Sequence, residues 1–183
     1  MPGRIDNQIY LTISGQPEKS VWASTNLNGP FSGPRDLGKV YNGPDGRRWQ
    51  KVKYAATLTQ AAVASNIVYW KDVTAAEVDT DLTDSAGSRN TVAGVIEANA
   101  TLPTAGQFAF VLQEADSTTL NGAAVNFQAG GKIIASSTVG VVTVTAQATA
   151  AVDNPFGTVA TAVDRSGGAG TVVCDIDIPS RLY

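Results

Sequence analysis

The fold is indicated most directly by residues 139–149, Val-Gly-Val-Val-Thr-Val-Thr-Ala-Gln-Ala-Thr, which open a longer run that ends at Val173. Val and Thr branch at Cβ and are enriched in strands, whereas this run contains no residue type that favours a long helix apart from Ala and Gln. Small residues and Gly-containing turns follow, and a second Val-rich segment closes the run. We therefore predict β-structure built from Val, Thr, Ala and Gly.

Working outward from this run, short β-like segments recur between turn signals at the spacing typical of a sandwich or barrel. Turn signals stand at Asn121-Gly122, Gly130-Gly131 and Gly167-Gly168. The segments 57–64 and 74–83 are rich in Ala and Thr, so a short helix stays open there. The predicted fold class is all-β, a compact β-barrel or β-sandwich with an extended N-terminal arm. The predicted strands lie near residues 47–54, 65–71, 91–98, 106–114, 131–137, 139–147, 156–163 and 170–178.

Alternation within two of these segments predicts which side chains enter the core. Phe108, Phe110 and Leu112 share one face of a strand with a period of two residues. In the segment 172–178 the apolar side chains alternate with Asp175 and Asp177, which places Cys174 among the core residues. Because this is the one cysteine, the chain has no internal disulfide, and burial must hold the fold together.

The first 46 residues differ in composition from the rest. Five of the eight prolines lie there among several glycines, which excludes a long helix or a central strand. The same range is too apolar for a solvated linker, so we expect it to bury side chains against its own domain or a neighbouring subunit. The predicted division is an arm over residues 1–46 and a barrel or sandwich domain over residues 47–183.

Composition also limits the function. The chain of 183 residues has a net charge of −3, 16% charged residues and no basic footprint beyond residues 47–53, so we expect no nucleic-acid partner. No apolar stretch approaches the length of a spanning helix and the N-terminus does not resemble a signal peptide, so we expect no membrane partner and synthesis in the cytoplasm. The chain has no histidine, the commonest general base and metal ligand.

Three groups of residues could still form a metal, phosphate-binding or catalytic site, but in each case we favour an interpretation without such a site. Glu77, Asp79, Asp81 and Asp84 lack the Gly and the closing Glu of a calcium loop, so an exposed acidic loop is the better reading. Gly130-Gly131-Lys132 continues with Ile133, which does not fit a phosphate-binding loop. Asp175 and Asp177 could be paired carboxylates of a hydrolase, but they have no aromatic cleft assigned to them. We expect no enzyme activity, no small-molecule substrate, no cofactor and no metal.

Trp22, Trp49 and Trp70 leave two interpretations open. They could form a platform on which sugars stack, or they could be core residues or anchors between subunits. Isolated tryptophans belong more often to cores and interfaces, and we favour that interpretation.

Several segments of the chain resemble the head decoration proteins of tailed bacteriophages. The resemblance covers roughly residues 37–178 and rests on Leu37-Gly38-Lys39-Val40-Tyr41, Asp45-Gly46-Arg47-Arg48-Trp49-Gln50-Lys51-Val52-Lys53, Asn90-Thr91-Val92-Ala93-Gly94-Val95, Gly106-Gln107-Phe108-Ala109-Phe110-Val111, Gly130-Gly131-Lys132-Ile133-Ile134-Ala135-Ser136-Ser137-Thr138-Val139-Gly140 and Phe156-Gly157-Thr158.

The resemblance implies a capsid decoration or cement protein, a β-rich module that is often trimeric and binds the outer surface of the major capsid protein shell. It also implies a place on the virion, at the capsid surface, and carries over no catalytic residue. The arm is a departure from the family pattern, and it could clamp the capsid or exchange between subunits. Candidate contacts to capsid or subunit are Tyr10, Trp22, Phe31 and Tyr41. The alternative is a tail or fibre-associated adhesin that binds glycans.

Overall fold

The computed structural model describes residues 11–12, 21–22, 36–43, 45–81, 92–136, 138–144 and 155–179. Every regular element within these ranges is a β-strand, which confirms the predicted all-β class. No helix long and apolar enough to cross a membrane occurs in the same ranges. The strands are β1 (Leu11–Thr12), β2 (Val21–Trp22), β3 (Val40–Asn42), β4 (Arg48–Tyr54), β5 (Ile67–Asp72), β6 (Glu77–Asp79), β7 (Val92–Val95), β8 (Phe108–Gly122), β9 (Asn126–Phe127), β10 (Lys132–Ala135), β11 (Val142–Val144), β12 (Gly157–Thr161), β13 (Val163–Asp164) and β14 (Gly170–Asp177).

Strands β4, β6, β5, β7 and β8 form a closed barrel, because each pairs with the next and β8 pairs back to β4. Each strand contributes an apolar side chain to one buried cluster, the interior of this first barrel. These side chains include Val52, Val68, Val78, Ala93 and Val111, all buried. Closure leaves few unpaired strand edges, which are the usual sites of unwanted pairing. The prediction of a β-barrel is thereby confirmed.

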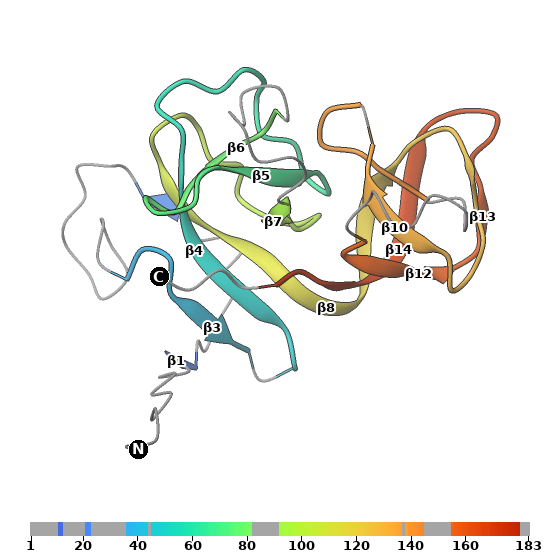
Figure 1. Ribbon diagram of the computed structural model, residues 1–183, viewed down its shortest axis with the longest axis horizontal. Coiled ribbons are helices and arrows are strands. Elements are labelled where there is room, and N and C mark those ends of the chain that lie inside the picture. Colours follow the sequence, from blue (N-terminus) through green and yellow to red (C-terminus); the bar gives the residue numbers. More distant parts are fainter. Residues whose placement is uncertain are drawn as a thin grey trace, which may run out of the picture.

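A second ring of pairings joins β8, β11, β10, β12 and β14. Its buried side chains again include one from each strand, namely Leu120, Val142, Ile133, Val159 and Cys174. Figure 1 shows this second barrel to the right of the first. Val and Ala dominate the first interior, as the Val- and Ala-rich sequence predicts, whereas Leu, Ile and Phe side chains make up much of the second.

The long strand β8 belongs to both barrels. Its first half pairs with β4, and its second half pairs with β14 from Glu114 to Gly122. Figure 1 shows β8 running from the left lobe into the right one. One buried cluster also continues from Tyr41 on β3 and Phe110 in the first barrel to Cys174 in the second. The two barrels are therefore joined by a continuous strand and a continuous core.

Most predicted strands are found, but one predicted turn is wrong and two segments left open above are now resolved. Asn121-Gly122 was predicted as a turn and instead ends β8, where Gly122 pairs with Gly170. Gly122 lies against the Phe127 ring, and a Cβ there would stand 2.9 Å from its Cζ atom. The segment 74–83 contains strand β6, and 57–64 is an irregular loop, so neither forms the short helix left open above.

The predicted arm contributes strands to the sheet. Strand β1 pairs parallel with β3 through Leu11 and Tyr41, and β2 pairs antiparallel with β8 through Trp22 and Phe108. Strand β3 lies within the range 1–46 and pairs with β4. The last part of that range is thus part of the sheet, while most of the remainder lies outside the described residues.

Candidate functional site

Two of the four candidate contact residues, Trp22 and Tyr41, lie among the residues that the structure describes. Tyr10 and Phe31 lie outside the described residues, and Trp22 is placed only by its backbone pairing with Phe108. The Tyr41 side chain is fully buried and packs edge-to-face on Phe110, with ring centroids 5.1 Å apart. Burial, with a smaller contribution from a nearby aspartate, raises the pKa of Tyr41 to about 12. A contact of these residues with capsid or subunit stays a prediction.

Two of the three tryptophans are core residues. Trp49 is 4% exposed and Trp70 is 1% exposed, so neither can offer a ring face to a sugar. The Trp49 Nε1 atom donates a hydrogen bond to Glu97 Oε2 at 3.0 Å, and Arg47 Nη1 donates to the other oxygen of that carboxylate at 2.5 Å. The sugar-platform interpretation is wrong for these two residues, and the core interpretation is confirmed for them.

We expected the acidic group around Glu77, Asp79 and Asp81 to form an exposed loop. This expectation is wrong, because Asp79 and Asp81 are buried and Glu77 is half-buried. Glu77 forms an ion pair of 3.0 Å with Lys53 across neighbouring strands. Asp79 is fully buried, and its Oδ1 atom accepts hydrogen bonds from the backbone N–H groups of Thr80 and Asp81. Asp84 lies outside the described residues. Among the residues described, no group of three or more acidic, Cys or His side chains is placed to hold a metal ion.

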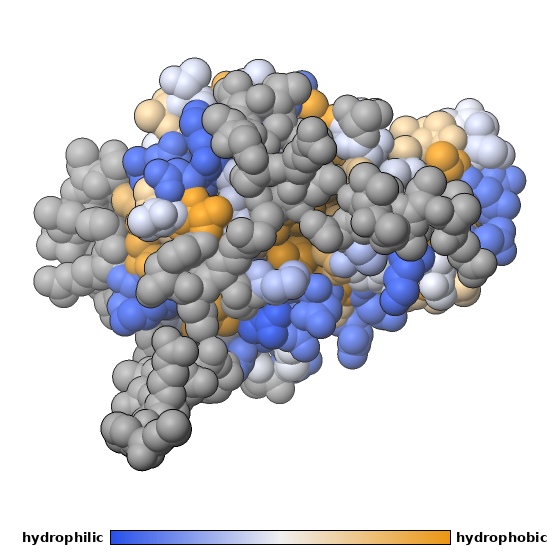
Figure 2. All heavy atoms as spheres, in the orientation of Figure 1, coloured by the Kyte–Doolittle hydropathy of each residue, from blue (hydrophilic) through white to orange (hydrophobic). Residues whose placement is uncertain are grey.

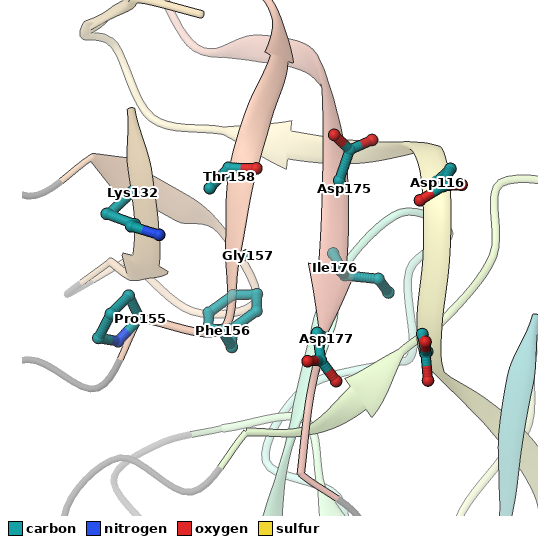
Figure 3. Close-up of a pocket in the computed structure, with 10 residues that line it drawn as sticks. Asp116, Lys132, Pro155, Phe156, Gly157, Thr158, Asp175, Ile176 and Asp177 are labelled. Carbon is teal, nitrogen blue, oxygen red and sulfur yellow. The ribbon is translucent and has the colours of Figure 1, made fainter. Parts of the chain in front are cut away.

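An acidic groove of about 360 Å³ lies on the outside of the second barrel. Glu114 and Asp177 face each other in the register between β8 and β14, and Asp116 and Asp175 follow one step further along the same strands. Figure 3 shows Lys132 on the opposite wall, with Phe156 and Ile176 between the walls. Hydrophilic residues follow the lower margin of the molecule in Figure 2, over β8 and the adjoining part of the second barrel.

Charged and polar partners already engage three of these carboxylates. Arg48, on β4 of the first barrel, forms ion pairs with Glu114 at 2.5 Å and with Asp177 at 3.3 Å. Its Nη2 atom also donates to the Ile178 carbonyl at 3.1 Å. Asp175 accepts a hydrogen bond from the Ser117 backbone N–H at 2.8 Å. Arg48 therefore links β4 of the first barrel to β8 and β14 beside the groove.

The sequence indicates only part of this groove. The alternation of residues 172–178 correctly places Asp175 and Asp177 on the outer face of β14. Glu114 and Asp116 join them through the register of β8 with β14, which pairs positions roughly sixty residues apart. Alternation within one segment shows on which face a side chain lies, but not which residue of a distant strand lies opposite it. No signal in the sequence would have joined these residues.

Cys174 is a core residue, as predicted. It is fully buried inside the second barrel, where burial, followed by the charge of Asp175, raises the pKa of its thiol to about 12. A thiol held in its protonated form is a poor nucleophile. The side chain thus contributes packing.

No protein-family model and no curated protein matches this sequence. Among solved structures, the chain is similar to the N base of the head fibre protein gp8.5 of bacteriophage phi29. The sequences are 10% identical, the TM-score is 0.40, and the alignment covers 73% of this chain and 100% of that chain. A likeness of this degree assigns neither a family nor a function.

Proposed function

We propose that this chain is a structural protein of a bacteriophage head, a decoration or cement protein that acts without catalysis. It would bind the outer surface of the major capsid protein shell as a homotrimer and stabilise the head. In this proposal the protein is made in the host cytoplasm and then binds to the capsid surface of the virion.

The observation that carries the proposal is the way N-terminal segments add to the sheet. Strand β1 extends the sheet beyond β3, and β2 pairs with β8 beside the single residue pair that joins β7 to β8. Strand addition gives affinity through main-chain hydrogen bonds and suits a protein that holds neighbours together. A closed double barrel supplies the rigid body that such an arm needs.

Two further observations support a structural role. The chain has no histidine, and its one cysteine is inert in the core. The segments that resemble phage head decoration proteins fall mainly on barrel strands, with residues 47–53 on β4, 106–111 leading into β8 and 130–140 around β10. The segments that carry the resemblance therefore lie mainly on strands that form the two barrels.

Binding to assembled shells tests the proposal. Shells of the phage that encodes this chain would be prepared without it, and co-sedimentation would be measured with the full chain and with a form lacking residues 1–35. We expect the full chain to pellet with the shells and to raise their resistance to heat. The shortened form, which keeps β3 and both barrels, should lose binding and retain the β-type circular dichroism spectrum.

The outcomes separate the parts of the proposal. A full chain that does not bind shells contradicts the decoration role. A shortened form that binds with full affinity contradicts the role of the arm while leaving shell binding in place. Point variants Tyr10→Ala, Trp22→Ala and Phe31→Ala then measure each candidate contact separately. Glycan binding without affinity for shells would replace the proposal with the adhesin alternative.

A further inference from the structure

Strand β8 has one edge that two other strands share. Strand β4 pairs with β8 from Phe108 to Glu114 and takes up one edge over this length. Because a strand has two edges, β7 and β2 lie on the other edge. Strand β7 pairs there through Val95 with Leu112, and β2 pairs with Phe108 and Ala109. The arm strand β2 therefore continues the wall of the first barrel where β7 has left β8.

The edge of β8 that β2 occupies is held in place by residues outside the arm. We call this edge, at Phe108 and Ala109, the acceptor edge. Both residues pair with β4 on their opposite edge, and Ala109 belongs to the buried cluster that fills the first barrel. Directly before the strand, the Tyr54 N–H donates a hydrogen bond to the Gln107 carbonyl at 2.8 Å. Barrel strands thus form the acceptor edge, and a strand that adds to it need not belong to the same chain.

Strand β2 lies apart from the strands that precede and follow it in the chain. The strand order through this region is β1, β3, β4, β8 and β2, so β4 and β8 separate β2 from both β1 and β3. Consecutive strands are neighbours in about two-thirds of cases, because short connections are favoured. Here three strand spacings, each about 4.8 Å, separate β2 from β3. A β2 strand from another copy would make the same main-chain pairing without a connection across β4 and β8.

We propose that β2 of one copy pairs with the acceptor edge of a neighbouring copy, so that the arm is exchanged between subunits. A single chain fills its acceptor edge with its own β2. Because the copies have the same sequence, exchange replaces each pairing with an identical one and loses no contact. Exchange around a closed ring of three supplies every acceptor edge with one strand and joins the copies. The inference rests on the homotrimer of the proposed function, and it names the strand that links the subunits and the edge that receives it.

A disulfide between register partners tests the exchange. Positions 21 and 109 face each other across β2 and β8. The Cα atoms of such partners lie about 4.5–5.5 Å apart, within the range that a disulfide spans. The variants Val21→Cys and Ala109→Cys would be made as separate chains in one cell, purified together and oxidised. We expect a disulfide-linked pair with one chain of each variant, identified by its intact mass and lost on reduction, because neither chain holds both cysteines.

A second mixture is the matched control. It combines Val21→Cys with Thr161→Cys, which places the second thiol at an exposed position of the second barrel. This mixture should give at least about tenfold fewer linked pairs, since the two positions are not register partners. The native Cys174 is fully buried and stays the same in every chain. Circular dichroism checks the fold, and Trp22→Cys with Phe108→Cys, the other register pair, replaces the first pair if Ala109→Cys does not fold.

The outcomes separate the exchange from the proposed function. A mixture without the linked pair, or a control that links equally well, overturns the inference. A single chain that carries both Val21→Cys and Ala109→Cys and closes the disulfide within itself, as a monomer, also overturns it, because each chain then keeps its own β2. Shell binding without linked pairs leaves the decoration role standing. Linked copies that do not bind shells leave the exchange standing and contradict the decoration role.

Discussion

Gly157→Ala is the sharpest test of the second barrel. Gly157 lies on β12, between β10 and β14, where it pairs with both Ile133 and Ile176. A Cβ atom at this position would stand 2.2 Å from the Asp175 carbonyl oxygen and 3.1 Å from the Ile176 Cα atom. Both of these atoms are backbone atoms of β14. The contact can be relieved only if β12 and β14 separate.

The expected cost follows from two opposing effects. Overpacking a well-packed site costs about 1–3 kcal/mol, and a clash with the backbone belongs at the upper end of that range. Replacing Gly by Ala also restricts the unfolded chain, which returns about 0.4–1 kcal/mol. We therefore expect the free energy of unfolding to fall by about 2 kcal/mol. In urea, with a slope of about 1–3 kcal/mol per M, the midpoint should fall by about 1 M.

The assay uses two signals with different origins. Trp49 and Trp70 lie on β4 and β5 of the first barrel, and Trp22 lies on β2, which pairs with the first half of β8, so tryptophan fluorescence reports the first barrel, whereas far-UV circular dichroism reports both. The substitution is in the second barrel. Because β8 and the buried cluster run through both barrels, we expect both signals to move to the same lower midpoint.

Gly167→Ala is the matched control, since it lies in a turn of the same barrel where an added Cβ meets nothing within 4 Å. It should leave the midpoint unchanged or slightly higher. An unchanged midpoint for Gly157→Ala would refute the clash argument. A fall in the dichroism midpoint alone, with fluorescence at the wild-type midpoint, would show that the barrels unfold separately and would refute their coupling.

Three further predictions concern buried polar and titratable groups. Trp49→Phe removes the donor to Glu97 and should lower stability by about 1–2 kcal/mol in urea denaturation; an unchanged midpoint contradicts it. Gln113→Leu removes the amide that donates to Gln50 inside the first barrel and should cost about 1–3 kcal/mol, whereas Gln50→Leu/Gln113→Leu should lie closer to the wild type. Because burial raises the pKa of Cys174 from 9.0 to about 12, the folded chain keeps a proton that the unfolded chain loses, so stability should fall between pH 9 and 12. Urea midpoints at several pH values should show a shallower fall in Cys174→Ala, and an identical slope would contradict this cause.

The sequence predicts the strands whose burial follows a local pattern. Strand β14 is the clearest case, because Val172, Cys174 and Ile176 are buried and Asp175 and Asp177 are not fully buried. The all-β class follows from the same residues. Strand β3 is missed because Gly38 and Gly43, close to both of its ends, suggest loop structure, although its residues pair with β4.

The structural features that the sequence does not predict depend on contacts between residues that are distant in the chain. The extension of β8 through Asp116 and Ser117 is supported by pairing with β14, and these two residues are themselves exposed and polar. Asp79 is buried in β6 because Lys71 and two backbone N–H groups surround its carboxylate. Local alternation predicts neither arrangement, because the stabilising groups come from other strands.

The strand that crosses both barrels also limits how this chain can evolve. Two barrels joined by a linker can be duplicated, lost or exchanged one at a time by recombination. Here a crossover that transferred either barrel alone would leave the other one strand short, with an open sheet in place of a closed ring. Strand β8 therefore makes the two barrels a single unit for recombination.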